Sequence, residues 1–427
     1  MTDFVGRDAV YERLQQHVAK PMTPGAFLLL GRTGIGKSAV LANFDMRFDD
    51  AILGVYMPLS IDRLADVGSF VMALAEFTTD LVDQYGFNAE RLRSLMETEP
   101  DPVQDNVIEA PVTPEIVSDP QTWLKDTYLP VLFRVTRPQR HVVWLWDDAD
   151  KLLTAISEGA LPDDFLVYLR DLLDTFPLLS IVLSLHTRHE ETLTQFMPLV
   201  SDANTLRLMR LSSWDAAQLL RVRVPGVLET VCEAVYRITG GDPRLVLRFG
   251  DYLLQTPQDE IYTETVRQGV PHVYAASQDI LRQLWQDLDA NERTVLRALA
   301  AMHYADPLRS VTAEQIEVWL VDTDTPLDLT TIHSALRSLE YRELVLQGEG
   351  GIRLTMELLQ RWLLDRAAQQ ADQDAATGVL VAPRVGRRGW LLLVLAAAAV
   401  IVLLVLVSQL PASPSTPLPE PTITLAD

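Results

Sequence analysis

One segment of the chain carries residue types and spacing that suit the binding of phosphate groups. The sequence Gly31-Arg32-Thr33-Gly34-Ile35-Gly36-Lys37-Ser38 fits the pattern G-x-x-x-x-G-K-[ST]. Its glycines let backbone N–H groups converge on phosphate oxygens, and a helix that begins there adds positive potential. Lys37 brings a charge for the β- and γ-phosphates, and Ser38 brings a hydroxyl ligand for Mg²⁺. The flanking residues predict a strand over 27–30 and a helix from Ala39, which is the context the motif needs.

Two acidic residues follow a second apolar segment. His141–Trp146 predicts a strand, and Asp147 and Asp148 come directly after it. Asp147 is placed to hold Mg²⁺ through its water shell, and Asp148 could polarise an attacking water as a general base. Taken alone, such a pair more often caps a helix, but the phosphate motif upstream favours the metal and catalytic roles.

A third apolar segment, 181–185, ends in His186-Thr187-Arg188. Arg188 could sense the γ-phosphate from this position. A surface arginine after a strand is common, however, so both interpretations stay open.

The elements that position these residues alternate in type up to Leu211. Short apolar segments recur between stretches with helical periodicity, at 26–30, 52–59, 142–146, 179–185 and 206–211. This alternation predicts parallel βαβ units with helices on both faces of one sheet. Residues 97–121 hold five prolines, seven acids and no Lys or Arg, and they predict a solvated insertion.

Helical patterns replace the strands after Leu211. Helices are expected over 214–267, and a further unit begins near Leu284, with helices expected at 294–302, 313–320 and 329–339. Residues 343–354 then predict a hairpin turning on Gly350-Gly351, an order typical of a winged helix. The predicted divisions are 1–211 for the α/β core, 212–283 for a helical lid, 284–367 for the winged-helix domain and 368–389 for a linker.

A membrane anchor is expected near the end of the sequence. Trp390–Val407 is a run of 18 apolar residues, and its extension to Leu410 is long enough to cross a hydrocarbon core of about 30 Å. Arg384, Arg387 and Arg388 precede the run, whereas the proline-rich tail 411–427 has no Lys or Arg. The positive-inside rule therefore predicts a single-pass protein of the cell membrane with its large N-terminal part in the cytoplasm and a disordered tail outside.

Composition excludes several classes of protein. The 36 basic and 58 acidic residues give a net charge of -22, which argues against nucleic-acid binding over a broad surface. A single cysteine, Cys232, excludes an internal disulfide and a cysteine zinc site. The unit 284–367 has 8 Arg against 14 acids, so contact with a partner protein or autoinhibition is favoured over DNA binding.

Five motifs occur in an order that resembles the AAA+/STAND-type P-loop ATPases, close to their origin-recognition-like group. They are Phe4-Val5-Gly6-Arg7, the phosphate motif, the strand ending in Asp147-Asp148, the strand ending in Arg188, and Gly240–Arg244. The resemblance covers roughly residues 3–265, or to 367 with the winged helix. It implies an α/β fold: a P-loop NTPase parallel sheet core of five strands with a helical lid, followed by a winged-helix domain and, from the apolar run, one transmembrane helix.

The resemblance also implies a nucleotide site at the junction of core and lid, with ATP and Mg²⁺ as cofactors. It places Val5, Gly6 and Arg7 near the adenine, and Pro243 and Arg244 against the nucleotide from the lid. Local physics offers another explanation for the lid residues, since Asp242 is a good N-cap and Pro243 a natural first helical residue. The expected nucleotide contacts are Val5, Gly6, Arg7, Gly31, Thr33, Gly34, Ile35, Gly36, Lys37, Ser38, Ala39, Arg188, Pro243 and Arg244, with Ser38 and Asp147 at the metal and Lys37 and Asp148 as catalytic groups.

Two departures from the family pattern bear on turnover. AAA+ enzymes usually have Glu as the second acid, where this chain has Asp148, and no motif identifies an arginine finger. Both favour a slow, membrane-tethered ATPase switch whose winged helix contacts a partner protein, and the resemblance leaves room for a nucleotide-dependent homo-oligomer. The alternatives are a membrane-anchored DNA-binding regulator of initiator type, and a scaffold that keeps its nucleotide without hydrolysing it.

Overall fold

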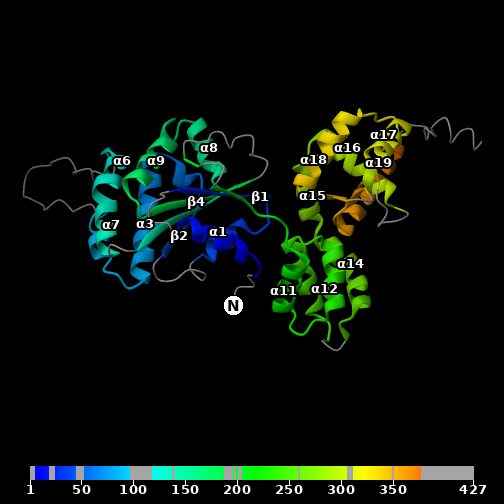
Figure 1. The fold of residues 1–427 in the computed structure, drawn as a ribbon, viewed down its shortest axis with the longest axis horizontal. Coiled ribbons are helices and arrows are strands. Elements are labelled where there is room, and N and C mark those ends of the chain that lie inside the picture. Colours follow the sequence, from blue (N-terminus) through cyan, green and yellow to red (C-terminus); the bar gives the residue numbers. More distant parts are fainter. Residues whose placement is uncertain are drawn as a thin grey trace, which may run out of the picture.

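An α/β unit is followed by two groups of helices in the computed structural model of this chain (Figure 1). The structure describes residues 5–18, 25–44, 52–96, 118–136, 140–186, 196, 199–200, 204–257, 260–304, 311–348 and 351–376, with side chains to 366. The expected transmembrane helix 390–410 and tail 411–427 lie outside these residues. Within the described part, none of the helices combines the length and apolar composition that crossing a bilayer requires.

One five-stranded sheet forms the centre of the α/β unit. Its order is β2-β3-β4-β1-β5, and every neighbouring pair is parallel. The strands are β1 Ala26–Gly31, β2 Ile52–Pro58, β3 His141–Asp147, β4 Leu179–His186 and β5 Thr205–Arg207. The parallel sheet expected from the alternating pattern is therefore confirmed. Because the strands run the same way, Gly31, Asp147 and His186 all reach the same, carboxyl edge of the sheet.

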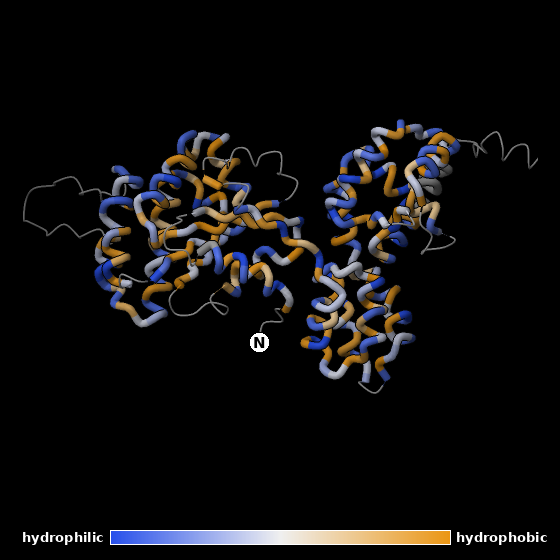
Figure 2. The backbone as a smooth tube through the Cα atoms, in the orientation of Figure 1, coloured by the Kyte–Doolittle hydropathy of each residue, from blue (hydrophilic) through white to orange (hydrophobic). Residues whose placement is uncertain are grey.

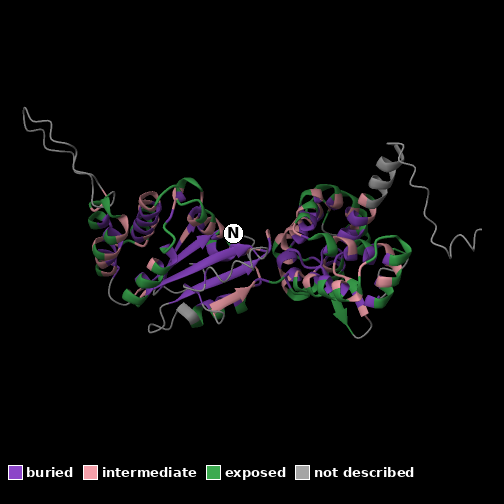
Figure 3. Ribbon diagram, turned by 90° about the horizontal axis from the view of Figure 1, so that it is seen from above, coloured by how far each residue is buried: buried purple, intermediate pink, exposed green. Residues whose placement is uncertain are grey.

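Alternating residues of β1 pack into two different hydrophobic clusters. Leu28 and Leu30 join a cluster that includes Trp146, whereas Phe27 and Leu29 join the cluster beneath α1 and α2. This period of two is what a strand covered on both faces requires. Figure 3 shows these strands coloured as buried, and Figure 2 shows that the same central strands are hydrophobic.

The α/β unit contains eight α-helices among its described residues. They are α1 Asp8–Val18, α2 Lys37–Ala42, α3 Val67–Gln84, α4 Glu90–Arg93, α6 Pro120–Thr122, α7 Leu129–Val135, α8 Asp150–Ser157 and α9 Phe165–Thr175, with a 3-10 turn at Asp62–Leu64 and a π-helical turn at Trp123–Tyr128. Phe70 of α3 packs edge-on against Trp146, with ring centroids 5.1 Å apart. This contact buries the strand that ends in Asp147.

The predicted insertion 97–121 is only partly described. Residues 97–117 lie outside the described part, but Pro120 and Gln121 already belong to α6. The Asp119 side chain accepts a hydrogen bond from the Thr122 N–H and caps α6, with Pro120 in its first turn. The acid and the proline that suggested a loop are thus the start signals of a helix.

Helices α11 Ser213–Arg223, α12 Glu229–Thr239, α13 Pro243–Leu253 and α14 Thr263–Ala276 follow the sheet. They share one hydrophobic cluster with the next unit, a cluster that runs from Leu211 to Leu363. Helix α15, Gln278–Gln286, spans the predicted boundary at residue 283. Helices α11–α14, called the lid below after the sequence prediction, and the following unit are therefore packed together.

The C-terminal unit consists of helices and one hairpin. Its elements are α16 Ala290–Met302, α17 Ala313–Asp322, α18 Leu329–Tyr341, β6 Val345–Gly348, β7 Gly351–Leu354 and α19 Glu357–Ala376. The hairpin is antiparallel, and Gly348 pairs with Gly351. Buried Glu292 of α16 accepts hydrogen bonds from Ser338 and, at 3.0 Å, from Arg342 Nε, which ties α16 to α18.

Helix α19 extends further than expected. The sequence predicts a linker over 368–389, yet residues 368–376 continue α19, and 377–389 lie outside the described part. Alanine and glutamine dominate this stretch, and both favour a helix. The segment leading toward the apolar run is therefore helical at its start.

Candidate functional site

The phosphate motif forms a loop between β1 and α2 at the carboxyl edge of the sheet. Gly34 and Gly36 have φ angles of 75° and 107°, a region that glycine adopts without strain. The Lys37 side chain is buried, and its Nζ donates to Gly31 O at 2.8 Å and to Arg32 O at 3.2 Å. Burial lowers the pKa of Lys37, although the charge of Asp147 opposes this effect. The ammonium group is thus fixed across the loop where phosphates are expected.

Asp147 is held rigidly by hydroxyl groups from its two neighbouring strands. Ser184 Oγ of β4 donates to Asp147 Oδ1 at 2.5 Å, and the Tyr56 hydroxyl of β2 donates to Oδ2 at 3.2 Å. Burial and the charge of Asp147 raise the pKa of Tyr56 to about 12, so the phenol stays a donor. Ser184 and Tyr56 were not predicted from the sequence, although a serine inside the apolar segment 181–185 was a usable signal.

These residues fit a bound Mg²⁺. Magnesium prefers oxygen ligands and commonly keeps several waters beside one or two protein ligands. Asp147 offers carboxylate oxygens that neutral hydroxyls orient, and Ser38 lies exposed at the start of α2. The donor set therefore suits a hard cation shared with phosphate oxygens.

Asp148 has a different setting from Asp147. Its φ of 58° lies in the left-handed region, and its side chain is 55% exposed. Lys151 Nζ donates to Asp148 Oδ2 at 3.0 Å and to Leu59 O at 2.7 Å. The Asp148 N–H donates to Ser184 Oγ at 3.0 Å. Asp148 is thus contacted by a surface lysine, whereas Asp147 is held by hydroxyl groups of the sheet.

The N-terminal segment connects the phosphate loop to the start of the lid. Arg7 donates to Ile35 O at 2.8 Å and to Met209 O at 2.6 Å, and burial lowers its pKa. Gly6 has a φ of 66°, and a Cβ there would lie 2.7 Å from the Asp215 side chain. Only glycine fits this position. The segment expected near the adenine is therefore beside the loop and the lid.

The lid lies directly on the phosphate loop. A Cβ built on Gly34 would lie 2.2 Å from Arg244 Nε, so the guanidinium group occupies the space over this glycine. Arg244 also donates to Gln283 Oε1 at 2.9 Å. Asp242 caps α13 by accepting from the Arg244 N–H at 3.0 Å. Its other oxygen lies 2.8 Å from Arg32 Nη1. Arg32 is thus a functional candidate that the sequence analysis missed.

Three guanidinium groups surround the single carboxylate of Asp242. Burial alone would raise the pKa of Asp242, but the charges of Arg32, Arg244 and Arg210 outweigh it and keep the pKa below its ordinary value. Burial, together with the charge of Arg32, lowers the pKa of Arg210 to about 9. This arginine–aspartate cluster, comprising Arg32, Arg210, Asp242 and Arg244, carries a surplus of positive charge next to the phosphate loop.

Arg210 also contacts the C-terminal unit. Its N–H donates to Glu343 Oε2 at 2.8 Å, and its Nη1 donates to Thr355 Oγ1 at 2.8 Å. Nearby, the Arg207 guanidinium carbon lies 3.0 Å from the centroid of the Tyr341 ring. The segment 207–210, between the sheet and α11, thus contacts residues 341, 343 and 355 beside the hairpin.

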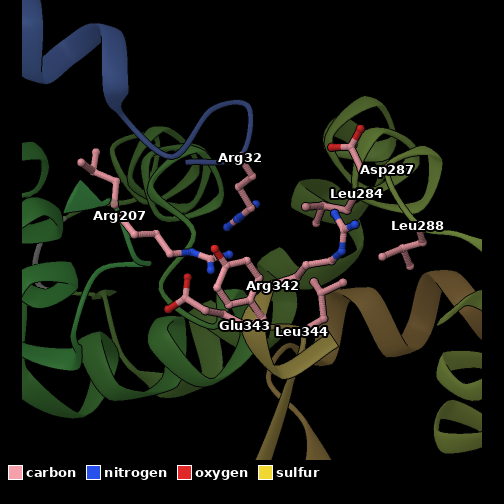
Figure 4. Close-up of a pocket in the computed structure, with 10 residues that line it drawn as sticks. Arg32, Arg207, Leu284, Asp287, Leu288, Arg342, Glu343 and Leu344 are labelled. Carbon is pink, nitrogen blue, oxygen red and sulfur yellow. The ribbon is translucent and has the colours of Figure 1, made fainter. Parts of the chain in front are cut away.

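A narrow cavity lies beside this contact, between the units. Its volume is about 20 Å³, and Arg32 and Arg207 face Leu284, Asp287 and the segment 341–344 across it (Figure 4). A space of this size holds about one water. The cavity therefore lies between the α/β unit and the C-terminal helices, and it is too small to hold a nucleotide.

Most of the expected site residues gather at this edge of the sheet. The loop residues, the N-terminal segment, Asp147, Pro243 and Arg244 lie around the start of α2. Ile35 is buried beneath the loop, while Thr33 and Ala39 are half-buried. Arg188 lies outside the described residues, and its sensing role stays a prediction.

No protein-family model matches the chain, and no curated protein matches it in sequence. Among solved structures, the Walker-type ATPase paby2304 of Pyrococcus abyssi superposes with a TM-score of 0.52 at 14% identity, covering 85% of this chain and 96% of that one. Cdc6p from Pyrobaculum aerophilum matches with a TM-score of 0.38 at 14% identity over 87% and 97% of the two chains. The Aeropyrum pernix ORC1 protein in complex with DNA gives 0.36 and 17% over 87% and 94%. The chain therefore has the fold of a Walker-type P-loop ATPase.

Proposed function

We propose that this chain is an ATP-binding, slowly hydrolysing molecular switch that a C-terminal helix tethers to a membrane. The observation that carries the proposal is the contact of the lid with the phosphate loop. Arg244 lies over Gly34, and Asp242 pairs with Arg32. A ligand on the loop would therefore change the environment of lid residues directly.

The chemistry of the loop suits a nucleoside triphosphate. Lys37, the glycine backbone and Arg244 offer donors and positive charge, and Ser38 with Asp147 offers oxygen ligands for Mg²⁺. When bound, Mg²⁺ neutralises the phosphate oxygens and orients them. Ser184 and Tyr56 hold the oxygens of Asp147 that would bind the metal.

The switch follows from charge balance in the arginine–aspartate cluster. Three arginines share one carboxylate, so phosphate oxygens at the loop would compete with Asp242 for Arg32 and Arg244. Arg210 belongs to the same cluster and holds Glu343 and Thr355 of the C-terminal unit. A change in the cluster would reach that unit through these two contacts.

Slow turnover is supported by the setting of Asp148. Lys151 donates to its Oδ2 and the side chain is exposed, so this carboxylate is not oriented by neighbouring strands as Asp147 is. General-base catalysis depends on a free acceptor within hydrogen-bond reach of the nucleophile. The geometry thus agrees with a switch that resets infrequently.

We infer that the C-terminal unit is a winged helix that contacts a partner protein. Three helices followed by an antiparallel hairpin support this assignment. Its excess of acids over arginines disfavours a duplex as the partner. The apolar run at 390–410 and the arginines before it support a membrane tether with this unit in the cytoplasm.

Replacing Lys37 by alanine should weaken ATP binding by about 10- to 100-fold, because the loop loses a charge-assisted contact to phosphate. Titration with a fluorescent ATP analogue measures this loss. Lys125→Ala, which removes a lysine paired with Asp171 at the surface, is the matched control and should bind normally. Equal affinity of the Lys37 variant and the wild type would reject the loop as the nucleotide site.

Asp148→Asn should leave ATP affinity nearly unchanged and reduce hydrolysis by at least about 100-fold, because the amide cannot accept the proton. Asparagine tolerates the left-handed backbone that this position adopts, so the fold should be kept. Phosphate release is the measurement, with Asp174→Asn as a surface control. Unchanged turnover in the Asp148 variant would remove this residue from the base role.

Deletion of residues 384–427 should release the chain from membranes without changing its ATP affinity, because the apolar run is lost and the nucleotide site is kept. Membrane fractionation and an ATP titration check the two parts. In intact cells, external protease should remove at most residues 411–427 from the full chain. Digestion of the ATPase core under those conditions would contradict the cytoplasmic orientation.

A further inference from the structure

Helix α15 carries a line of polar side chains close to the nucleotide site. Asp279 and Gln283 lie within the helix, and Asp287 is the residue at its C-cap. These positions follow one another at intervals of four residues, which places them on one face of a helix. Leu284 of the same helix lines the narrow cavity opposite Arg32 (Figure 4). Part of α15 therefore lies beside the phosphate loop.

Two residues of this line contact the parts of the molecule that form the nucleotide site. Gln283 Oε1 accepts from Arg244 Nη1 of α13 at 2.9 Å. Asp287 Oδ2 lies 3.6 Å from His186 Nε2 at the end of β4, and both side chains are largely buried. Since β4 pairs with β1, His186 is the neighbour of Gly31 at the start of the phosphate loop. Helix α15 therefore contacts both the lid arginine and the carboxyl edge of the sheet.

The contact at Asp279 differs from these two. Its Oδ2 accepts from Arg248 Nη2 of α13 at 3.0 Å, but the two side chains are 67% and 31% exposed. An ion pair between exposed side chains contributes little to stability. Of the two contacts from α15 to α13, the one made by Gln283 is therefore the one that can determine how the Arg244 side chain lies.

The Arg244 guanidinium group rests on Gly34 and keeps donors that the protein does not use. A Cβ at Gly34 would lie 2.2 Å from Nε and 2.3 Å from the guanidinium carbon. Gln283 holds Nη1, whereas Nε and Nη2 are buried and have no hydrogen-bond partner among the described residues. Nη2 lies 3.6 Å from Asp242 Oδ2, which is too far for a hydrogen bond. Because the guanidinium group is planar, the bond at Nη1 fixes the directions in which Nε and Nη2 donate.

The side chain of Gln283 is neutral, which suits the orientation of a phosphate-binding arginine. An amide oxygen accepts a hydrogen bond without cancelling the charge of the guanidinium group. A carboxylate at this position would form an ion pair with Arg244 and compete with phosphate for it. Gln283 therefore orients Arg244 and leaves its positive charge for an anion at the loop.

We propose that Gln283 is a positioning residue for nucleotide binding, which aims Arg244 at the phosphate groups of a nucleotide on the loop. The proposal rests on the proposed function of the loop as an ATP site. Helix α15 is also fixed to the C-terminal unit, where Arg293 of α16 donates to Trp285 O at 3.1 Å. A movement of that unit away from the lid would therefore draw Gln283 from Arg244 and weaken the binding of phosphate.

The test is a double-mutant cycle on the full chain, with a fluorescent ATP analogue as the probe. Gln283→Met removes the acceptor but keeps a long side chain that favours a helix, and the affinity should fall about fivefold or more. In the Arg244→Ala background the same change should cost less than about twofold, because no guanidinium group remains to be aimed. The matched control, Gln286→Met, makes the same replacement at an exposed position of α15 and should bind normally.

Either of two results in this cycle would overturn the proposal. One is an affinity of Gln283→Met equal to that of the wild type. The other is a loss that is just as large in the Arg244→Ala background, which would show that Gln283 supports the fold rather than acting through Arg244.

Gln283→Glu tests the need for a neutral acceptor. This variant keeps an oxygen at the same place but adds a negative charge, so ATP affinity should fall about 10-fold or more. An affinity equal to or above that of the wild type would contradict the role of the neutral amide.

Lys37→Ala, measured in the same titration, separates the positioning role from the ATP site on which it rests. A loss of affinity in Lys37→Ala without a loss in Gln283→Met would keep the ATP site and reject the positioning role. Equal binding by the wild type and Lys37→Ala, or no binding by the wild type, would reject both together.

Discussion

The buried ion pair between Asp242 and Arg32 joins the two halves of the nucleotide site. Asp242 is fully buried, and burying a carboxylate costs several kcal/mol unless it is paired and hydrogen-bonded. Oδ1 accepts from the backbone N–H groups of Arg244 and Leu245 at the start of α13, and Oδ2 forms an ion pair with Arg32 at the phosphate loop. The Asp242 side chain therefore both caps α13 and attaches the lid to the core. Loss of Asp242 would remove the carboxylate that these arginines share, whereas loss of Arg32 would remove the arginine closest to it.

The same pair explains why the C-terminal unit takes part in the site. Arg210 adds a third guanidinium to the cluster and reaches Glu343 and Thr355 at the base of the hairpin. A ligand can shift such an assembly only by the difference in its affinity for the two states. Phosphate groups would provide this difference in affinity, because they compete with Asp242 for the arginines around it. The contact network thus gives a physical route from the loop to the hairpin.

Local patterns predicted much of the fold and the centre of the site. The alternation of apolar and helical segments is a short-range property, and it correctly indicated a parallel sheet with the phosphate loop after β1. Arg32, Ser184 and Tyr56 were missed because their roles depend on which strands are neighbours and on where the lid folds back. The order β2-β3-β4-β1-β5, which brings Tyr56 and Ser184 to either side of Asp147, follows from tertiary packing. The left-handed backbone of Asp148 likewise has no sequence signature, since aspartate adopts it only where the surroundings impose it.

In the proposed switch, a nucleotide bound at the loop is held by the lid as well as by the core. Arg244→Ala and Arg248→Ala provide a matched pair, because both arginines lie on α13, yet Arg244 contacts the loop and Arg248 pairs with Asp279 at the surface. ATP affinity measured by titration should fall by about 10-fold or more for Arg244→Ala and stay unchanged for Arg248→Ala. Equal affinities for the two variants would show that the lid does not hold the nucleotide, and would contradict the switch.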